Sequence, residues 1–134
     1  MGRKKARDSA FKCVYQLGFD LNIDIQETLK YNYEENNNTL EEQEYISLLL
    51  NGIKDNLSEI DNKILDCLKD WSIERIAKID LAILRLAIYE IIYIEELSVK
   101  VSANEAVELS KTYGNDNSPN FVNGVLAKII ENKG

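Results

Sequence analysis

Three features of this 134-residue sequence predict an all-helical fold. The first is an apolar run over residues 79–94, whose three charged residues spread around a helical wheel instead of gathering on one side. The second is the helical spacing of apolar residues in the segments around this run. The third is a pair of capping boxes, which begin at Thr39 and Ser102 and mark the starts of two helices. We therefore expect a central helix that is surrounded by other helices.

The central run carries its charges at Asp80, Arg85 and Glu90. A membrane-spanning helix would need roughly 20 residues with few or no charges. This run is shorter and is charged near its middle, so burial inside the protein explains it better. We expect no contact with a membrane.

The other helices follow from apolar spacing and from residues that start or stop a helix. Three consecutive asparagines should break the second helix, and Ser118 followed by Pro119 should begin the last one. Gly114 is expected to end the preceding helix in a left-handed conformation, and Ser58 with Asp61 to start the fourth helix. The expected helices span residues 4–21, 24–35, 39 to a join at 56–58, 58–70, a short turn at 73–78 that is either separate from the central helix or continuous with it, 79–94, 103–113 and 118–132, with residues 95–101 as a connector.

Composition excludes several classes of enzyme. The sequence has no histidine, which rules out imidazole catalysis, hydrolytic triads and the commonest zinc sites. Cys13 and Cys67 stand alone among apolar positions, and we interpret them as small buried hydrophobic residues. We predict no catalytic residue, no metal and no cofactor. The length and the lack of an apolar signal segment predict one domain, residues 1–134, in the cytoplasm.

Charge is distributed unevenly along the chain. The net charge is −7, yet residues 1–12 carry five Lys or Arg residues against Asp8 alone, a net of +4, so the rest of the chain sums to −11. A basic tip on an acidic body favours an anionic ligand at the N-terminus and a basic protein elsewhere. On charge alone, a basic start that serves only solubility is equally favoured.

Aromatic residues fall beside cations on the first helix. Lys4, Arg7, Phe11 and Tyr15 share a flank about 120° from the core stripe. Single-stranded nucleic acid is held by this combination of phosphate neutralisation and base stacking. We assign Phe11 to packing under a neighbouring helix, and for Tyr15 packing and base stacking are equally favoured. The lone Trp71 is expected to anchor the core.

The last helix places an aromatic ring, a glycine and a cation on one side, at Phe121, Gly124 and Lys128. A glycine inside a helix costs about 1 kcal/mol relative to alanine. Its presence therefore indicates that something approaches Gly124 closely. Another helix is the first explanation for this approach, and RNA is the second.

Four segments, which together span nearly the whole chain, form a recognisable series. They are Arg3-Lys-Lys-Ala-Arg7 running to Val14-Tyr15-Gln16; Ile83-Leu-Arg-Leu-Ala-Ile-Tyr-Glu90; Ala103-Asn-Glu-Ala-Val-Glu-Leu-Ser-Lys111 with Tyr113-Gly114; and Ser118-Pro-Asn-Phe-Val-Asn-Gly-Val-Leu126. In this order the segments resemble the NusB family of bacterial transcription antitermination factors, and the last segment is the most specific.

The resemblance implies a fold of about seven helices in two packed bundles that share the central helix. It also implies a function without catalysis. NusB-like proteins pair with NusE, which is also a protein of the small ribosomal subunit, and hold the single-stranded boxA element of nascent RNA so that RNA polymerase reads through terminators. The expected partners are therefore boxA RNA, NusE and the transcription elongation complex, with a homodimer left open.

Two alternatives are weighed against this function. A NusB-like module also occurs in ribosomal RNA cytosine methyltransferases, but the sequence has no glycine-rich cofactor loop and no catalytic cysteine motif. The other alternative is a helical adaptor that binds only protein, which would be favoured if the basic tip proved dispensable.

The resemblance also assigns roles to particular residues. The family's arginine-rich start corresponds to the four cations between Arg3 and Arg7, and its RNA-facing aromatic residues correspond to Tyr15 and Phe121, with Tyr113 a weaker match. The expected RNA-binding residues are Arg3, Lys4, Lys5, Arg7, Tyr15, Asp80, Arg85, Tyr113, Phe121 and Lys128.

Arg85 and Glu90 are five residues apart, which is outside the spacing of an intrahelical pair. An ion pair between each of them and another helix, through residues such as Glu105 or Lys111, is favoured over ligand contact. The remaining acidic surface, at Glu90, Glu95 and Glu96, is expected to face a basic partner such as NusE.

Overall fold

The computed structural model describes residues 3–94 and 96–133. Within these ranges the chain forms seven α-helices and one short 3₁₀ turn, which confirms the predicted all-helical class. The elements are α1 (Arg3–Phe19), α2 (Ile25–Asn36), α3 (Leu40–Asp55), α4 (Leu57–Asp66), the 3₁₀ turn η1 (Ile73–Arg75), α5 (Lys78–Tyr93), α6 (Val99–Tyr113) and α7 (Ser118–Lys133).

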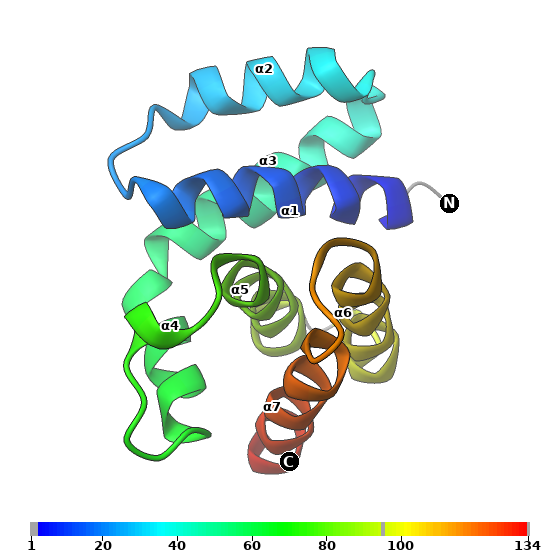
Figure 1. Ribbon diagram of the computed structural model, residues 1–134. Coiled ribbons are helices and arrows are strands. Elements are labelled where there is room, and N and C mark those ends of the chain that lie inside the picture. Colours follow the sequence, from blue (N-terminus) through cyan, green and yellow to red (C-terminus); the bar gives the residue numbers. More distant parts are fainter. Residues whose placement is uncertain (1–2, 95, 134) are drawn as a thin grey trace.

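Helix α5 is the element around which the others pack. In Figure 1 it is seen almost end-on near the middle, with α1, α2 and α3 above it and α4, α6 and α7 below and beside it. It contacts α1, α3, α4, α6 and α7. Every residue from Asp80 to Ile91 is buried. The predicted central helix shared by two bundles is confirmed.

The first capping box forms as predicted. The backbone N–H of Glu42 donates to Thr39 Oγ1 at 3.2 Å, and the Thr39 N–H donates to Glu42 Oε1 at 3.0 Å. Just before it, Asn37 adopts a left-handed conformation, with φ of 51°, and ends α2. The asparagine-rich segment is therefore a turn between α2 and α3.

The second capping box does not start α6, contrary to prediction. Ser98 accepts a hydrogen bond from the N–H of Val101 at 3.4 Å and so caps the helix four residues earlier. Ser102 is instead buried within the helix. Part of the expected connector is helical because Val99 packs against the core and extends α6 backward.

Three other boundaries differ from the expected ones. Helix α1 ends at Phe19, so Leu21, which was expected on the core face, is 51% exposed. Helix α4 begins at Leu57 without a side-chain cap, so Ser58 does not start it. The 3₁₀ turn is separate from α5, because the two residues between them leave the helical conformation.

Two glycines are required by close packing. Gly114 is extended, with φ of −90° and ψ of −169°, so the predicted left-handed cap is wrong. A Cβ at this position would lie 2.8 Å from the carbonyl oxygen of Ser110 and would collide with Ser118. Within α3, a Cβ on Gly52 would collide with the Tyr89 hydroxyl of α5. These two glycines let neighbouring helices and turns approach one another.

Both cysteines are buried and free, as predicted. Burial raises the pKa of the Cys13 thiol to about 12, so this thiol stays protonated and unreactive near neutral pH. Among the described residues, no helix is both long enough and apolar enough to cross a membrane.

Candidate nucleic-acid interface

A row of aromatic side chains runs along α1 from the core to the surface. Phe11, Tyr15 and Phe19 are four residues apart and lie on one side of the helix. Their ring centroids are separated by 6.0 Å and 4.9 Å, and Phe11 also stacks on Tyr113 of α6 at 4.7 Å. Phe11 is buried, as expected, whereas Phe19 is 61% exposed. The row therefore connects the core to an exposed aromatic surface.

The exposed end of this row borders a groove of about 420 Å³. Its walls come from α1, the start of α5 and the turn between α6 and α7, and they include Tyr15, Phe19 and Tyr113. Lys78 stands at its edge, with its ammonium 5.5 Å from the Phe19 ring centroid and 3.0 Å from the carbonyl oxygen of Gly18. The groove thus combines rings for stacking with a cation fixed above one of them.

Asp80 lies in the first turn of α5 and also lines the groove. It is 7% exposed, and its Oδ1 has no hydrogen-bond partner among the described residues. A carboxylate oxygen in this position can accept a hydrogen bond from an N–H donor. The N-terminus of a helix is a favourable place for its negative charge.

Trp71 is on the surface, 40% exposed, so the prediction that it anchors the core is wrong. Asp70, the residue just before it, adopts a left-handed conformation with a φ of 61°. The indole stacks on Phe121 with ring centroids 5.9 Å apart, and the Arg75 guanidinium lies 5.3 Å from the indole ring. A second aromatic and cationic cluster therefore lies beside the groove, since Ser118 of the groove is one turn before Phe121.

Gly124 lies one turn beyond Phe121 and is exposed. A Cβ on this residue would meet nothing within 4 Å, so the prediction that another helix approaches it is wrong. Lys128, on the same side of α7, donates a hydrogen bond to the Cys67 carbonyl oxygen at 3.3 Å. The bare backbone of α7 at Gly124 is thus open to an external ligand.

The basic start of the chain divides into exposed and buried cations. Lys4 and Lys5 are exposed, and Lys5 lies 4.0 Å from a Glu42 carboxylate oxygen. The guanidinium of Arg3, which is also exposed, stands 4.2 Å from the centroid of the Tyr45 ring. Lys4 has no ion pair among the described residues, so its charge is the most available of the four cations between Arg3 and Arg7.

Arg7 is 5% exposed and forms a buried pair with Glu90 of α5. Its Nε lies 3.0 Å and 2.8 Å from the two carboxylate oxygens, and Glu90 also accepts a hydrogen bond from the Tyr45 hydroxyl. Arg85 is likewise buried, and it donates through Nε and Nη2 to the carboxylate of Asp61 at 2.9 Å and 2.8 Å. The predicted interhelical ion pairs are therefore present, but the partners are Asp61 and Arg7 instead of the expected Glu105 and Lys111.

These pairs correct part of the predicted binding surface. The guanidinium groups of Arg7 and Arg85 point into the protein, because a carboxylate from another helix neutralises each of them there. Glu90 is 1% exposed, so it does not face a partner. Glu96 is exposed, and Glu95 lies outside the described residues.

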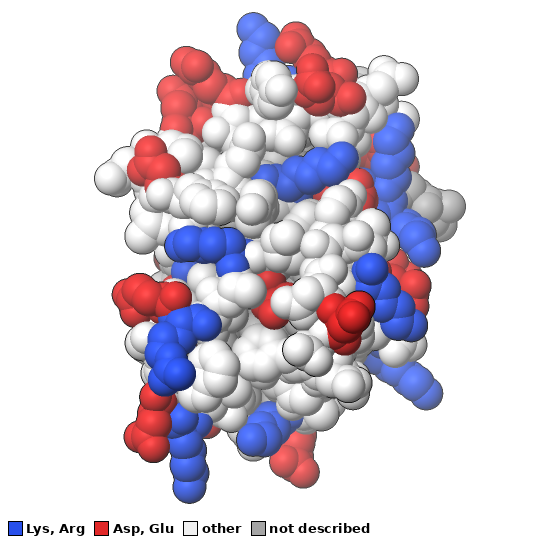
Figure 2. All heavy atoms as spheres, viewed as in Figure 1, with Lys and Arg blue, Asp and Glu red and all other residues white. Residues whose placement is uncertain are grey.

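Sequence reasoning missed Phe19, Lys78 and Arg75. The four-residue spacing from Tyr15 to Phe19 was a signal for the first of these. The positions of Lys78 and Arg75 over aromatic rings depend on how α5 and η1 pack against α1 and α7, which no local pattern specifies. In Figure 2 the middle of this face is mostly white with a few Asp or Glu atoms, and Lys and Arg side chains lie above it and on both sides.

Together these features define a class: a small helical protein whose exposed aromatic rings, each with a cation nearby, suit the bases and phosphates of a single-stranded nucleic acid. The sequence profile of the NusB family matches residues 4–131. The chain belongs to the NusB family.

Individual relatives agree with this assignment. The transcription antitermination protein NusB of Clostridium acetobutylicum is 45% identical over 131 residues, which cover 97% of this chain and 96% of that protein. A structure of T. maritima NusB superposes with a TM-score of 0.90 at 34% identity, over 98% of this chain and 92% of that one. A chain in the crystal structure of the antitermination factors NusB and NusE in complex with dsRNA superposes with a TM-score of 0.89 at 30% identity, over 97% of this chain and 96% of that one.

Proposed function

We propose that this chain is a transcription antitermination factor that binds the single-stranded boxA element of nascent RNA together with NusE and catalyses no reaction. The observation that carries the RNA contact is the exposed set of aromatic rings with cations close to them. In one cluster Lys78 lies over Phe19, and in the other Arg75 lies over Trp71, which stacks on Phe121.

Each chemical group of the site has a role in this proposal. The rings stack on bases, and the cations neutralise neighbouring phosphates. Asp80 would repel a phosphate, so a base and not the RNA backbone enters the groove. An N–H group of this base donates a hydrogen bond to Asp80 Oδ1. Tyr15 and Tyr113 form the inner wall of the groove. The exposed backbone at Gly124 lets the strand continue along α7 past Phe121.

The basic start extends this surface along α1. Phe19 is fifteen residues from Lys4, or about 22 Å along the helix, so only a strand of several nucleotides reaches both ends. Arg3, Lys4 and Lys5 supply the charge at the far end, and Lys128 adds a weaker contribution because it is bonded to the protein backbone.

We place NusE on the acidic body of the molecule, near the exposed Glu96. The whole chain, residues 1–134, acts as one module in the transcription elongation complex, and therefore in the cytoplasm. A basic partner approaching this surface would associate faster, with a smaller gain in final affinity.

The test is a titration of labelled boxA-like single-stranded RNA with this protein, alone and with NusE, over a range of salt. Binding should be weak alone and tighter with NusE. If roughly three phosphates are neutralised, the slope of log K against log salt should be about −2. A scrambled single strand and a duplex of the same sequence serve as controls. Equal affinity for all three RNAs, unaltered by NusE, would contradict the proposal.

A further inference from the structure

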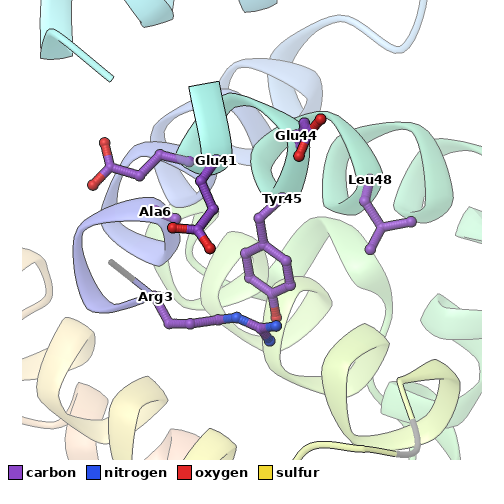
Figure 3. Close-up of a pocket in the computed structure, with 7 residues that line it drawn as sticks. Arg3, Ala6, Glu41, Glu44, Tyr45 and Leu48 are labelled. Carbon is purple, nitrogen blue, oxygen red and sulfur yellow. The ribbon is translucent and has the colours of Figure 1, made fainter. Parts of the chain in front are cut away.

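A second hollow, of about 260 Å³, lies between α1 and α3, at the opposite end of α1 from the groove. Figure 3 shows the side chains around it, with Arg3 and Ala6 coming from α1 and Glu41, Glu44, Tyr45 and Leu48 from α3. Of these side chains the proposed RNA contact uses only Arg3, and a ligand in the hollow does not depend on RNA binding.

The ring of Tyr45 forms a fixed wall of the hollow. Its hydroxyl donates to Glu90, whose carboxylate is held in turn by the buried Arg7. The open face of the ring carries the Arg3 guanidinium, 4.2 Å from the ring centroid (Figure 3). The protein thus already shows that this ring accepts a cation, and the cation comes from an exposed side chain at the start of α1.

Two exposed carboxylates line the hollow without an ion-pair partner among the described residues. Glu41 and Glu44 are exposed, and neither forms an ion pair with any described residue. Glu42, between them, differs because it is buried, caps α3 and lies near Lys5. Glu41 and Glu44 are one turn apart, so their charges act on the same side of α3.

Apolar surface continues from these carboxylates. Leu40 is 79% exposed and Leu48 is 51% exposed. Leu40, Glu44 and Leu48 are four residues apart, so they form one exposed stripe of α3 that combines leucines with a negative charge. Large exposed apolar side chains grouped in this way are typical of a protein contact.

We propose that this hollow and the adjoining stripe of α3 form a docking site for a basic, amphipathic segment of a protein partner. The segment inserts an arginine or lysine side chain against Tyr45, displacing Arg3, and pairs it with Glu41 and Glu44. Its apolar residues cover Leu40 and Leu48. Nucleic acid is a poor occupant, because its phosphates would meet two unpaired carboxylates.

The probe is a fluorescein-labelled amphipathic peptide with arginine and leucine residues four positions apart, and its control has glutamine in place of each arginine. The full-length protein should bind the arginine peptide, with an affinity that falls as salt rises. It should not bind the glutamine peptide at the same concentrations. Equal binding of the two peptides would overturn the role of the cation.

Matched variants then locate the contact. The double variant Glu41→Gln/Glu44→Gln should bind the arginine peptide about tenfold more weakly. Glu74→Gln/Glu131→Gln makes the same change in net charge at exposed positions elsewhere and should change affinity by less than about threefold. Equal weakening by both double variants would reduce the effect to general acidity and overturn the proposal.

The displacement of Arg3 has its own signature. Arg3→Ala should tighten binding of the arginine peptide by about threefold, because the Tyr45 ring no longer has to lose its internal cation. Lys4→Ala removes an equal charge from the next residue and should have a smaller effect. If the two variants behave alike, the ring is not the acceptor. A wild-type dimer that Leu48→Ser dissociates, together with no peptide binding, would make the hollow a contact between copies and overturn the proposal.

Discussion

Arg7 and Arg85 lie in segments that resemble a family of RNA-binding proteins, whereas Arg75 and Lys78 lie outside those segments. The resemblance alone would suggest that Arg7 and Arg85 are the cations available to RNA, but the structure shows the opposite. The first two are buried against carboxylates of other helices, and the second two stand over exposed aromatic rings. The role of a cation in this molecule is therefore set by what reaches it in three dimensions. A cation that pairs with a carboxylate of another helix is buried, whereas a cation over a surface ring stays available to a ligand.

The two regions also differ in what they contribute energetically. A buried ion pair has a large desolvation cost, and removing one partner leaves an uncompensated charge that costs about 3–5 kcal/mol. A cation over an exposed ring contributes only about 0.5–1 kcal/mol to stability. Substitutions should therefore affect folding in the first region and binding in the second.

Glu90→Gln should have the largest effect. It leaves the Arg7 guanidinium buried without a countercharge, so we expect a loss of about 3–5 kcal/mol in unfolding free energy and a fall in Tm of roughly 10–20 °C. Thermal and urea unfolding measure this change. At a temperature where the variant is folded, its affinity for single-stranded RNA should equal that of the wild type. A stable variant with lost RNA affinity would erase the distinction between the two regions.

Trp71→Ala tests the other side of the comparison. The indole is at the surface and stacks on Phe121, so its removal should lower RNA affinity by about 1–3 kcal/mol with little change in Tm. Trp71→Phe keeps a ring at this position and should retain most of the affinity. RNA titrations and melting curves of both variants measure these effects. A large fall in Tm for Trp71→Ala would show that the indole stabilises the core, which would contradict this prediction.

Two helical glycines, Gly124 and Gly52, differ in the space around them, and smaller effects are expected from replacing them. Gly124 has open space around it, so Gly124→Ala should stabilise α7 by about 1 kcal/mol. If RNA passes close to this backbone, the same variant should bind RNA more weakly. Gly52→Ala, which forces a Cβ against Tyr89, should instead cost about 1–3 kcal/mol of stability without an RNA defect. Melting curves and titrations of both variants separate these outcomes.

Tyr113 lies at the boundary between the two regions and should show the smallest effect, at alkaline pH. Burial, together with the hydrogen bond that its hydroxyl donates to Asp8 at 2.6 Å, raises the pKa of Tyr113 to about 12. In the unfolded chain the pKa is about 10. The stabilisation is therefore complete below pH 10 and is lost as the pH rises towards 12.

Urea unfolding at pH 9 and pH 11.5 tests this dependence. The wild type should lose more unfolding free energy over this interval than Tyr113→Phe, which has no phenol to ionise at this position. The buried Cys13 thiol, whose pKa is also about 12, titrates in both proteins and cancels in the comparison. An equal loss in the two proteins would show that Tyr113 does not contribute.

Local patterns predicted the fold well where a helix or its start depends on residues that are close together in the sequence. The largely apolar run over residues 79–94 identified α5, and the Thr39 capping box fixed the start of α3. The start of α6 was wrong because Ser98 and Ser102 are both acceptable caps, and only the packing of Val99 on the core decides between them.

The candidate site was less predictable because its parts come from distant segments. Nothing near Arg7 in the sequence indicates that Glu90 will reach it, 83 residues away. Trp71 looked like a core residue from its size, but it lies on the surface directly after the turn at Asp70. The resemblance to a family identified Phe121, but the cation and indole that complete its cluster became visible only in three dimensions.

The proposed RNA contact requires exposed rings beside cations, and not aromatic rings in general. It is tested by comparing the affinity of boxA-like single-stranded RNA for Phe19→Ala, which removes a 61% exposed ring beside Lys78, and for Tyr31→Ala, which removes a 57% exposed ring from α2, away from the groove. Phe19→Ala should bind roughly 5- to 150-fold more weakly than the wild type, and Tyr31→Ala should bind within about twofold of it. Equal affinities for the two variants would contradict the claim.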